Sequence, residues 1–205
     1  MVELPKCRRT SWEEADAWAD AIAHTVWDRK NVPETIVALT RGGWVPARLL
    51  ADRLGVKRLV SIRLQHWGVT AQPSGKAELT EGLSGPVKGQ NVLVVDDITD
   101  TGESLALAVQ AVRDAGASRV ESAACLHIGH SKFVPDYYAE EIPRNEWVWV
   151  VFPWNYWEDI DHLIRQALAE GKDAGGVRAL LLTRSGLDVP AEHVTQTLER
   201  RGTGQ

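Results

Sequence analysis

The sequence predicts an α/β fold with a Rossmann-like, mostly parallel central sheet flanked by helices. Two apolar runs rich in β-branched residues, 35–39 (TIVAL) and 92–95 (VLVV), have the composition of strands buried on both faces of a parallel sheet. Each run leads into a short polar turn and then into a helical pattern, as expected of a strand–turn–helix unit. The length of 205 residues fits one such domain with a small appendage.

The elements follow in order along the chain. An amphipathic helix is predicted after residue 10, because Ala15, Trp18, Ile22 and Val26 recur at helical spacing. Apolar runs then predict the core strands, at 35–39, 58–64, 92–95 and 119–126, with a last core strand, apolar on both faces, at 147–154 (WVWVVFPW).

One long segment of the core has little periodicity. Residues 65–90 contain seven glycine or proline residues, which predicts a loop rather than a helix or strand. A loop of this length in a compact domain usually has a function.

Beyond residue 160 the pattern changes. A helix is predicted at 161–170, a linker at 171–176, and short helices at 177–182 and 190–201. We therefore expect a core at 1–160 and a helical C-terminal extension at 161–205. The sequence leaves open whether this extension packs on the core, dimerises or stays mobile.

Composition and charge exclude several classes of protein. Apolar residues make up 44% and charged residues 25% of the chain, which is typical of a globular protein. The net charge of −5 argues against a nucleic-acid partner. Cys7 and Cys125 form no disulfide or metal pattern, and no segment predicts a membrane span or a signal peptide. We expect a cytoplasmic protein that does not bind membranes.

The stretch 92–105 (VLVVDDITDTGESL) is the strongest candidate for a site. Asp96 and Asp97 follow the strand directly, and in open α/β sheets ligands bind beyond the carboxyl ends of strands. The turn after them enters a helix, whose first N–H groups bind phosphate well. Thr101 and Ser104 add hydroxyl donors, and Gly102 permits close approach of the backbone. Hydrogen-bond donors for a phosphate group, placed beside two carboxylates, fit a sugar phosphate.

A second strand–turn–helix unit carries Arg41, Gly42 and Gly43. Paired glycines allow unusual backbone geometry, and Arg41 supplies a fixed positive charge, so the turn could capture an anion. A solvent-facing arginine on a tight turn is the alternative interpretation. The position of the turn, one βαβ unit before the acidic pair, favours anion binding.

These motifs resemble those of the type I phosphoribosyltransferases, in which apolar residues, two acids and a D-T-G turn bind phosphoribosyl pyrophosphate (PRPP). The resemblance covers roughly residues 10–160, and TRGG and VVFPW resemble the 6-oxopurine branch (xanthine or hypoxanthine-guanine enzymes). It implies a Mg²⁺-dependent enzyme of purine salvage that transfers a phosphoribosyl group from PRPP to a purine base. The products are a nucleoside 5′-monophosphate and pyrophosphate.

The resemblance also implies roles for individual residues. Asp96 and Asp97 would hold the ribose hydroxyls and, through water, the metal, and Asp100 would be the general base. The implied PRPP-binding set is Arg41, Gly42, Gly43, Asp96, Asp97, Ile98, Thr99, Asp100, Thr101, Gly102, Glu103 and Ser104. A non-proline cis peptide is expected in the loop at Arg41. Residues 65–90 would form a flexible hood that closes over PRPP, with Trp67 as its aromatic residue.

For the base pocket, the resemblance implies that Trp149 stacks on the purine, with Val150 as a backbone contact and Ile98 on the opposite face of the ring. Core packing is the competing interpretation of Trp149.

Recognition of the base edge is where the sequence departs from the family. The lysine that often contacts the exocyclic oxygen has no clear counterpart here, and His127, His130 and Lys132 are the candidates. We favour Lys132, because an ammonium group donates at any physiological pH. Surface histidines without a ligand are the alternative.

Two other functions stay open on the sequence. One is transfer to a different acceptor, such as adenine or uracil. The other is a non-catalytic regulator that senses PRPP or a nucleotide. The family resemblance also implies a homodimer.

Overall fold

The computed structural model describes residues 3–66 and 77–202. Residues 12–147 form one compact unit, and the described parts of 1–11 and 148–205 form a second.

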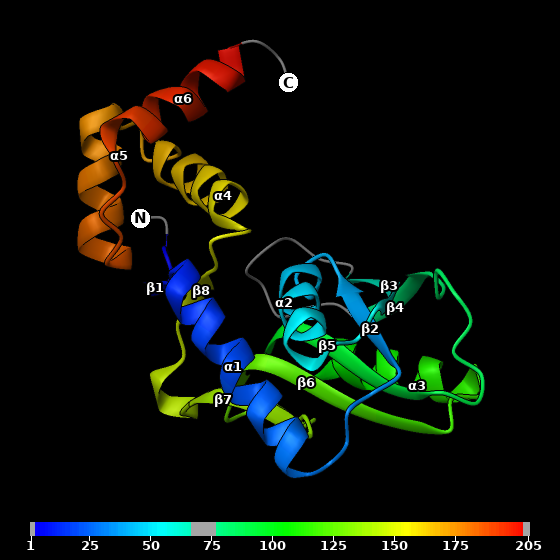
Figure 1. The fold of residues 1–205 in the computed structure, drawn as a ribbon. Helices are drawn as coiled ribbons and strands as arrows, with labels where there is room; N and C mark the ends of the chain where they lie inside the picture. Colours follow the sequence, from blue (N-terminus) through cyan, green and yellow to red (C-terminus); the bar gives the residue numbers. More distant parts are fainter. Residues whose placement is uncertain (1–2, 67–76, 203–205) are drawn as a thin grey trace. The chain divides into compact units, whose positions relative to one another are not determined.

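A six-stranded sheet forms the centre of the unit 12–147 (Figure 1). Its spatial order is β4-β3-β2-β5-β6-β7, and all neighbours are parallel except β3 and β4. The strands are β2 (Thr35–Thr40), β3 (Arg58–His66), β4 (Ala77–Glu81), β5 (Asn91–Thr99), β6 (Arg119–Ile128) and β7 (Tyr137–Ile142). The predicted mostly parallel α/β fold is confirmed.

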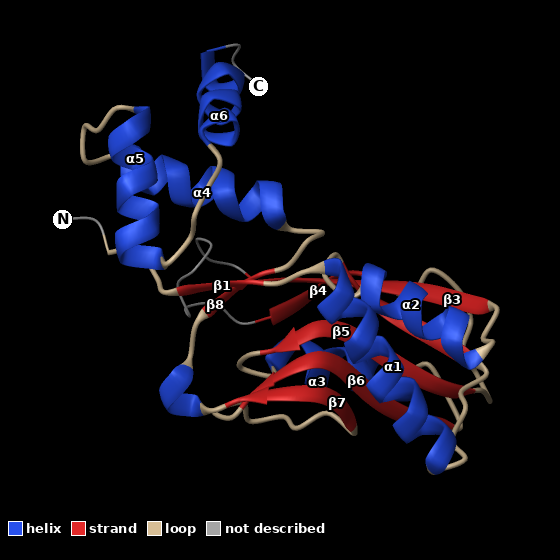
Figure 2. Cartoon of the chain, turned by 60° about the vertical axis from the view of Figure 1, so that its left-hand side comes forward, coloured by secondary structure: helices blue, strands red, loops and turns tan. Residues whose placement is uncertain are grey.

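Helices cover both faces of this sheet (Figure 2). Helices α1 (Trp12–Asp28) and α2 (Trp44–Leu54) pack on one face, where Leu93 and Val95 are buried. Helix α3 (Glu103–Asp114) packs on the other face, against Val92 and Val94. Because successive side chains of a strand point to opposite faces, a strand covered on both sides must be apolar throughout.

The last strand of the main sheet differs from the one predicted. The segment 147–154 is not a core strand: only Trp149–Val151 forms a strand, β8, which pairs in parallel with β1 (Cys7–Arg9) in the second unit. The last core strand is β7, which the sequence had not predicted. It is an edge strand that pairs only with β6, and its polar residues Glu140 and Glu141 interrupt the apolar run by which a buried strand is predicted.

The predicted loop 65–90 is also partly wrong. Strand β3 extends to His66, and β4 pairs antiparallel with it, so two parts of the segment are strands, whereas residues 82–90 contain no helix or strand. Residues 67–76, which include Trp67, lie outside the described residues, so the predicted hood stays a prediction.

The second unit contains the short β1–β8 sheet and the C-terminal helices. These are α4 (Tyr156–Leu168), α5 (Ala174–Leu180) with a π-helical turn at Leu181–Ser185, and α6 (Ala191–Gly202). Ile160, Leu181 and Val194 form a hydrophobic core with Leu4 and Val151. The extension therefore packs with the N-terminal segment of the chain. The predicted border at residue 160 falls inside α4.

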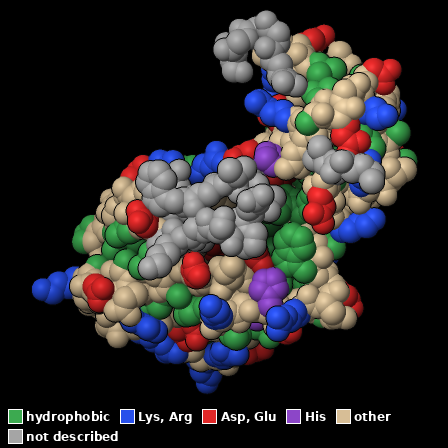
Figure 3. All heavy atoms as spheres, turned by 180° about the vertical axis from the view of Figure 1, so that it is seen from behind, with side chains coloured by type: hydrophobic (Ala, Val, Ile, Leu, Met, Phe, Trp, Pro, Cys, Tyr) green, Lys and Arg blue, Asp and Glu red, His purple; other side chains and the backbone are tan. Residues whose placement is uncertain are grey.

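Charge and hydropathy of the surface are mixed. Figure 3 shows Lys and Arg side chains interspersed with Asp and Glu side chains over one face of the molecule. No helix within residues 3–66 or 77–202 is long and apolar enough to cross a membrane.

Candidate functional site

The acidic pair lies near the carboxyl end of β5. Asp97 is on the α1/α2 face of the sheet and is buried, and its backbone N–H donates to Oδ1 of Asp96 over 2.9 Å. Burial, and then the adjacent charge of Asp97, raise the pKa of Asp96 well above the usual range of a carboxyl. A ligand that brings positive charge or a hydroxyl donor would therefore stabilise the charged form of this pair.

The loop between β2 and α2 lies against this pair. An ideal Cβ on Gly42 would stand 2.3 Å from Oδ2 of Asp97, and one on Gly43 would stand 2.3 Å from the carbonyl oxygen of Val95. Both glycines are needed because the loop crosses β5 without room for a side chain. The Thr40–Arg41 peptide bond is cis, as the resemblance implies. The loop is thus in direct contact with Asp97 and with the backbone of β5.

The turn after β5 is fixed by a neighbouring loop. Gly102 has a φ of +83°, which favours glycine, and an added Cβ would lie 2.5 Å from Oγ of Ser131 and 2.6 Å from Cβ of Phe133. The N–H of Lys132 donates to the carbonyl of Thr101 over 3.2 Å. The loop after β6 therefore holds the turn from which α3 begins in place. The first N–H groups of α3 have no partner within the helix, which makes this turn a candidate phosphate site.

Asp100 lies where three loops converge. Its Oδ1 is 2.7 Å from Nε2 of His130, in the loop after β6, and accepts a hydrogen bond of 3.3 Å from Nε1 of Trp147, which follows β7. The Asp100 side chain is 45% exposed, so it can still reach a ligand. A carboxylate held by two neighbours and open to solvent is placed to accept a proton.

Trp147 is the residue that sequence reasoning missed. The apolar segment 147–154 predicts a single strand, and the family resemblance implies that Trp149 stacks on the base. The structure instead has a 3₁₀ turn at Arg144–Glu146, which delivers Trp147 to Asp100 with 39% of its surface exposed. The turn-forming sequence I-P-R-N-E, directly before this tryptophan, is the signal that could have identified it.

Trp149 and Val150 lie in the second unit. Nε1 of Trp149 donates to Oδ1 of Asp159 over 3.2 Å, and its ring packs against the hydrophobic core of that unit. Val150 is buried and pairs with Arg8 of β1. Ile98 belongs to the first unit and is half-buried. A sandwich of Trp149 and Ile98 around a base stays a prediction.

The three candidates for the base edge occupy different environments. His127 is buried at the end of β6, 5.0 Å from the ring of Tyr138, and burial lowers its pKa, so it is neutral near pH 7. Lys132 is exposed and forms no ion pair with any residue that the structure describes. Only His130 contacts the proposed base Asp100.

The donor set fits a particular kind of magnesium site. Within the described residues, no group of three or more His, Cys, Asp or Glu side chains could hold a metal ion. At the carboxyl end of β5, Asp96 and Asp97 provide two adjacent carboxylates. Mg²⁺ commonly binds through one or two carboxylates together with water and substrate phosphates. The pair therefore fits an ion that arrives with a phosphorylated substrate.

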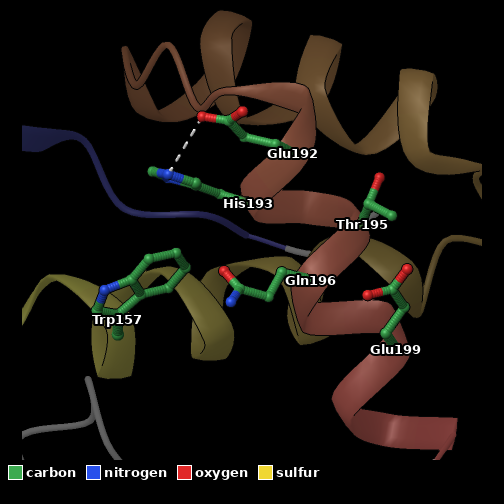
Figure 4. Close-up of a pocket in the computed structure, with 6 residues that line it drawn as sticks. All are labelled: Trp157, Glu192, His193, Thr195, Gln196 and Glu199. Carbon is green, nitrogen blue, oxygen red and sulfur yellow. Dashed lines mark ion pairs between the residues drawn. The ribbon is translucent and has the colours of Figure 1, made fainter.

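A separate hollow lies on the second unit (Figure 4). It has a volume of about 520 Å³ and is lined by Trp157, Glu192, His193, Thr195, Gln196 and Glu199. Trp157 comes from α4 and the others from α6. Nδ1 of His193 is 2.7 Å from the hydroxyl of Tyr156, which fixes the ring.

Comparison with known proteins gives consistent results. The family model described as "Phosphoribosyl transferase domain" matches residues 11–160. The xanthine-guanine phosphoribosyltransferase of Desulfotalea psychrophila is 26% identical over 145 residues, which is 71% of this chain and 84% of that protein. The same enzyme of Gluconobacter oxydans is 26% identical over 146 residues, 71% of this chain and 82% of that protein.

Solved structures show the same fold. The purine phosphoribosyltransferase of Pyrococcus horikoshii has a TM-score of 0.63 and 29% identity, over 73% of this chain and 93% of that chain. The xanthine-guanine-hypoxanthine phosphoribosyltransferase of Helicobacter pylori has a TM-score of 0.61 and 23% identity, over 77% of this chain and 97% of that chain.

Proposed function

The chain belongs to the phosphoribosyltransferase family, and from this premise we propose that it transfers the phosphoribosyl group of PRPP to a 6-oxopurine base. The products are a nucleoside 5′-monophosphate and pyrophosphate, as in purine salvage. The relatives named xanthine-guanine phosphoribosyltransferases support a purine acceptor, so xanthine, guanine and hypoxanthine are favoured.

One contact carries this proposal. The loop of Arg41, Gly42 and Gly43 lies directly on Asp97, close enough that a methyl group on Gly42 would overlap the carboxylate. The loop that we propose to bind an anion and the carboxylate that we propose to bind hydroxyls are thereby adjacent. A pyrophosphate attached to a ribose requires both kinds of group side by side.

Each part of PRPP has a candidate partner. The backbone of Arg41–Gly43 and the guanidinium group of Arg41 would hold the pyrophosphate. Asp96 and Asp97 would accept hydrogen bonds from the ribose hydroxyls, and the turn from Thr99 to Ser104 would hold the 5′-phosphate. Mg²⁺, when bound beside Asp96 and Asp97, would supply positive charge to the leaving pyrophosphate.

We place proton transfer on Asp100. As pyrophosphate leaves, positive character develops at the anomeric carbon, and the attacking base nitrogen must lose a proton. The Asp100 carboxylate would take this proton. Trp147, which donates to the same carboxylate, would offer its ring as a face for the base, with Trp149 as the alternative.

We also propose a cytoplasmic location and a homodimer. Cys7 and Cys125 are both free thiols, which supports a reducing, cytoplasmic location. The homodimer stays a prediction from the family resemblance.

A panel of bases tests the function. Purified protein, PRPP and Mg²⁺ are mixed with hypoxanthine, guanine, xanthine, adenine or uracil, and pyrophosphate release is measured. We expect release with at least one 6-oxopurine and little with adenine or uracil. Release only with adenine or uracil would refute the 6-oxopurine acceptor. PRPP binding without release from any base would indicate the regulator instead.

A further inference from the structure

We propose that His130 is a positioning residue for Asp100, whose carboxylate it orients for proton abstraction. This inference rests on the proposed function, because Asp100 has a proton to accept only if the protein transfers a phosphoribosyl group to a base. It concerns a residue that lies in the loop after β6, outside the motifs that bind PRPP.

The first support is where the contacts fall on the carboxylate. Two groups contact Oδ1 of Asp100: Nε2 of His130 at 2.7 Å and Nε1 of Trp147 at 3.3 Å. Oδ2 accepts no hydrogen bond from the residues in 3–66 and 77–202. One oxygen is therefore held by the protein, and the other is left for a ligand.

The second support is the rigidity of the turn that carries His130. The N–H of Gly129 donates to the carbonyl of Ile142 over 2.9 Å, and the N–H of Ser131 donates to the carbonyl of Ile128 over 2.9 Å. An ideal Cβ on Gly129 would lie 3.2 Å from Oε1 of Glu141 and 3.3 Å from the backbone nitrogen of Arg144. Gly129 and Ser131, on either side of His130, are thus hydrogen-bonded to β7 and β6, and Gly129 lies close to the 3₁₀ turn.

A simple surface ion pair is the competing explanation, and such pairs contribute little. Two features oppose it. The His130 side chain is only 29% exposed, and it shares its target oxygen with an indole N–H from a different loop. Two donors from separate loops that converge on one oxygen fix the plane of a carboxylate, whereas one flexible surface pair would not.

The length of the side chain at position 130 gives a direct test of the positioning role. His130→Gln retains an amide nitrogen close to the position of Nε2, whereas His130→Asn carries the same amide group but is one carbon too short to reach Asp100. Steady-state kcat and KM are measured for both variants by pyrophosphate release with the preferred base. His24→Ala, on the exposed face of α1, is the control for loss of a histidine. Thermal unfolding checks that each variant is folded.

We expect His130→Asn to lower kcat by about 10²-fold, the order associated with an ångström of misplacement, while KM for PRPP changes less than about 3-fold. His130→Gln should retain kcat within about 5-fold, because the donor stays near Oδ1. Equal kcat values for the Asn and Gln variants, at any level, would overturn the positioning role. Failure of the wild type to release pyrophosphate with any base would overturn the proposed function itself, so the two failures are distinguishable.

Discussion

The substitution Gly42→Ala tests the central contact of the site. The added methyl carbon would lie 2.3 Å from Oδ2, 2.5 Å from Cγ and 2.6 Å from Oδ1 of Asp97, whereas ordinary contacts begin at 3.4 Å. The loop or the carboxylate must therefore move by about 1 Å. The buried Asp97 cannot easily yield, because it is part of β5 between two paired strands.

The cost follows from this displacement. Overpacking of a tight site costs about 1–3 kcal/mol of folding stability. Misplacement of a binding group by about 1 Å can lower activity by about 10²-fold. We therefore expect kcat/KM for PRPP to fall by about 10²-fold in Gly42→Ala, with a moderate loss in the free energy of unfolding.

Two measurements separate these effects. Pyrophosphate release gives kcat/KM, and urea unfolding gives the free energy of unfolding. Gly175→Ala is the matched control, because the nearest atom to its added Cβ is 3.7 Å away and α5 should tolerate alanine. Wild-type kcat/KM and PRPP affinity in Gly42→Ala would refute the placement of PRPP at this loop.

Three further predictions concern the acids and the aromatic residues. The double variant Asp96→Asn, Asp97→Asn should weaken PRPP binding in calorimetry, since hydrogen bonds to charged groups contribute about 1.5–3 kcal/mol each; unchanged affinity would remove PRPP from this pair. Asp100→Asn should lower kcat by about 10²–10⁴-fold with PRPP affinity retained; a kcat within a few-fold of the wild type would leave Asp100 a structural residue. Trp147→Ala should weaken base binding by about 1–3 kcal/mol, and a loss of that size in Trp149→Ala alone would restore the original assignment.

The parts of the site that lie within one stretch of sequence were predictable. A strand covered on both faces must be apolar, so the run Val92–Val95 indicates such a strand. The acidic and small residues that follow it contribute little to packing, and they therefore indicate a binding site. The pairing of Arg41–Gly43 with the acidic pair was predictable as well, because the carboxyl ends of parallel strands lie on the same edge of a sheet.

The rest depends on contacts between distant segments. Asp100, His130 and Trp147 come from loops after three different strands, and nothing in their local sequence links them. The error at 147–154 has a related cause. Val151 is apolar because it packs among the C-terminal helices, so its hydrophobicity reports a core other than that of the main sheet. The pattern of apolar residues shows that a segment is buried, but not which other segment of the chain buries it.

The pairing of β1 with β8 has a consequence for the order of folding. The second unit is assembled from both ends of the chain, since Leu4 and Cys7 join residues that follow Val148. On the ribosome, residues 12–147 emerge before residues 148–205 and can complete their sheet without the C-terminus. The N-terminal segment can pair only after β8 has been made, and this pairing closes a loop of chain that contains residues 12–147. Removal of the first nine residues should therefore leave the catalytic sheet able to fold while depriving the C-terminal helices of part of their core.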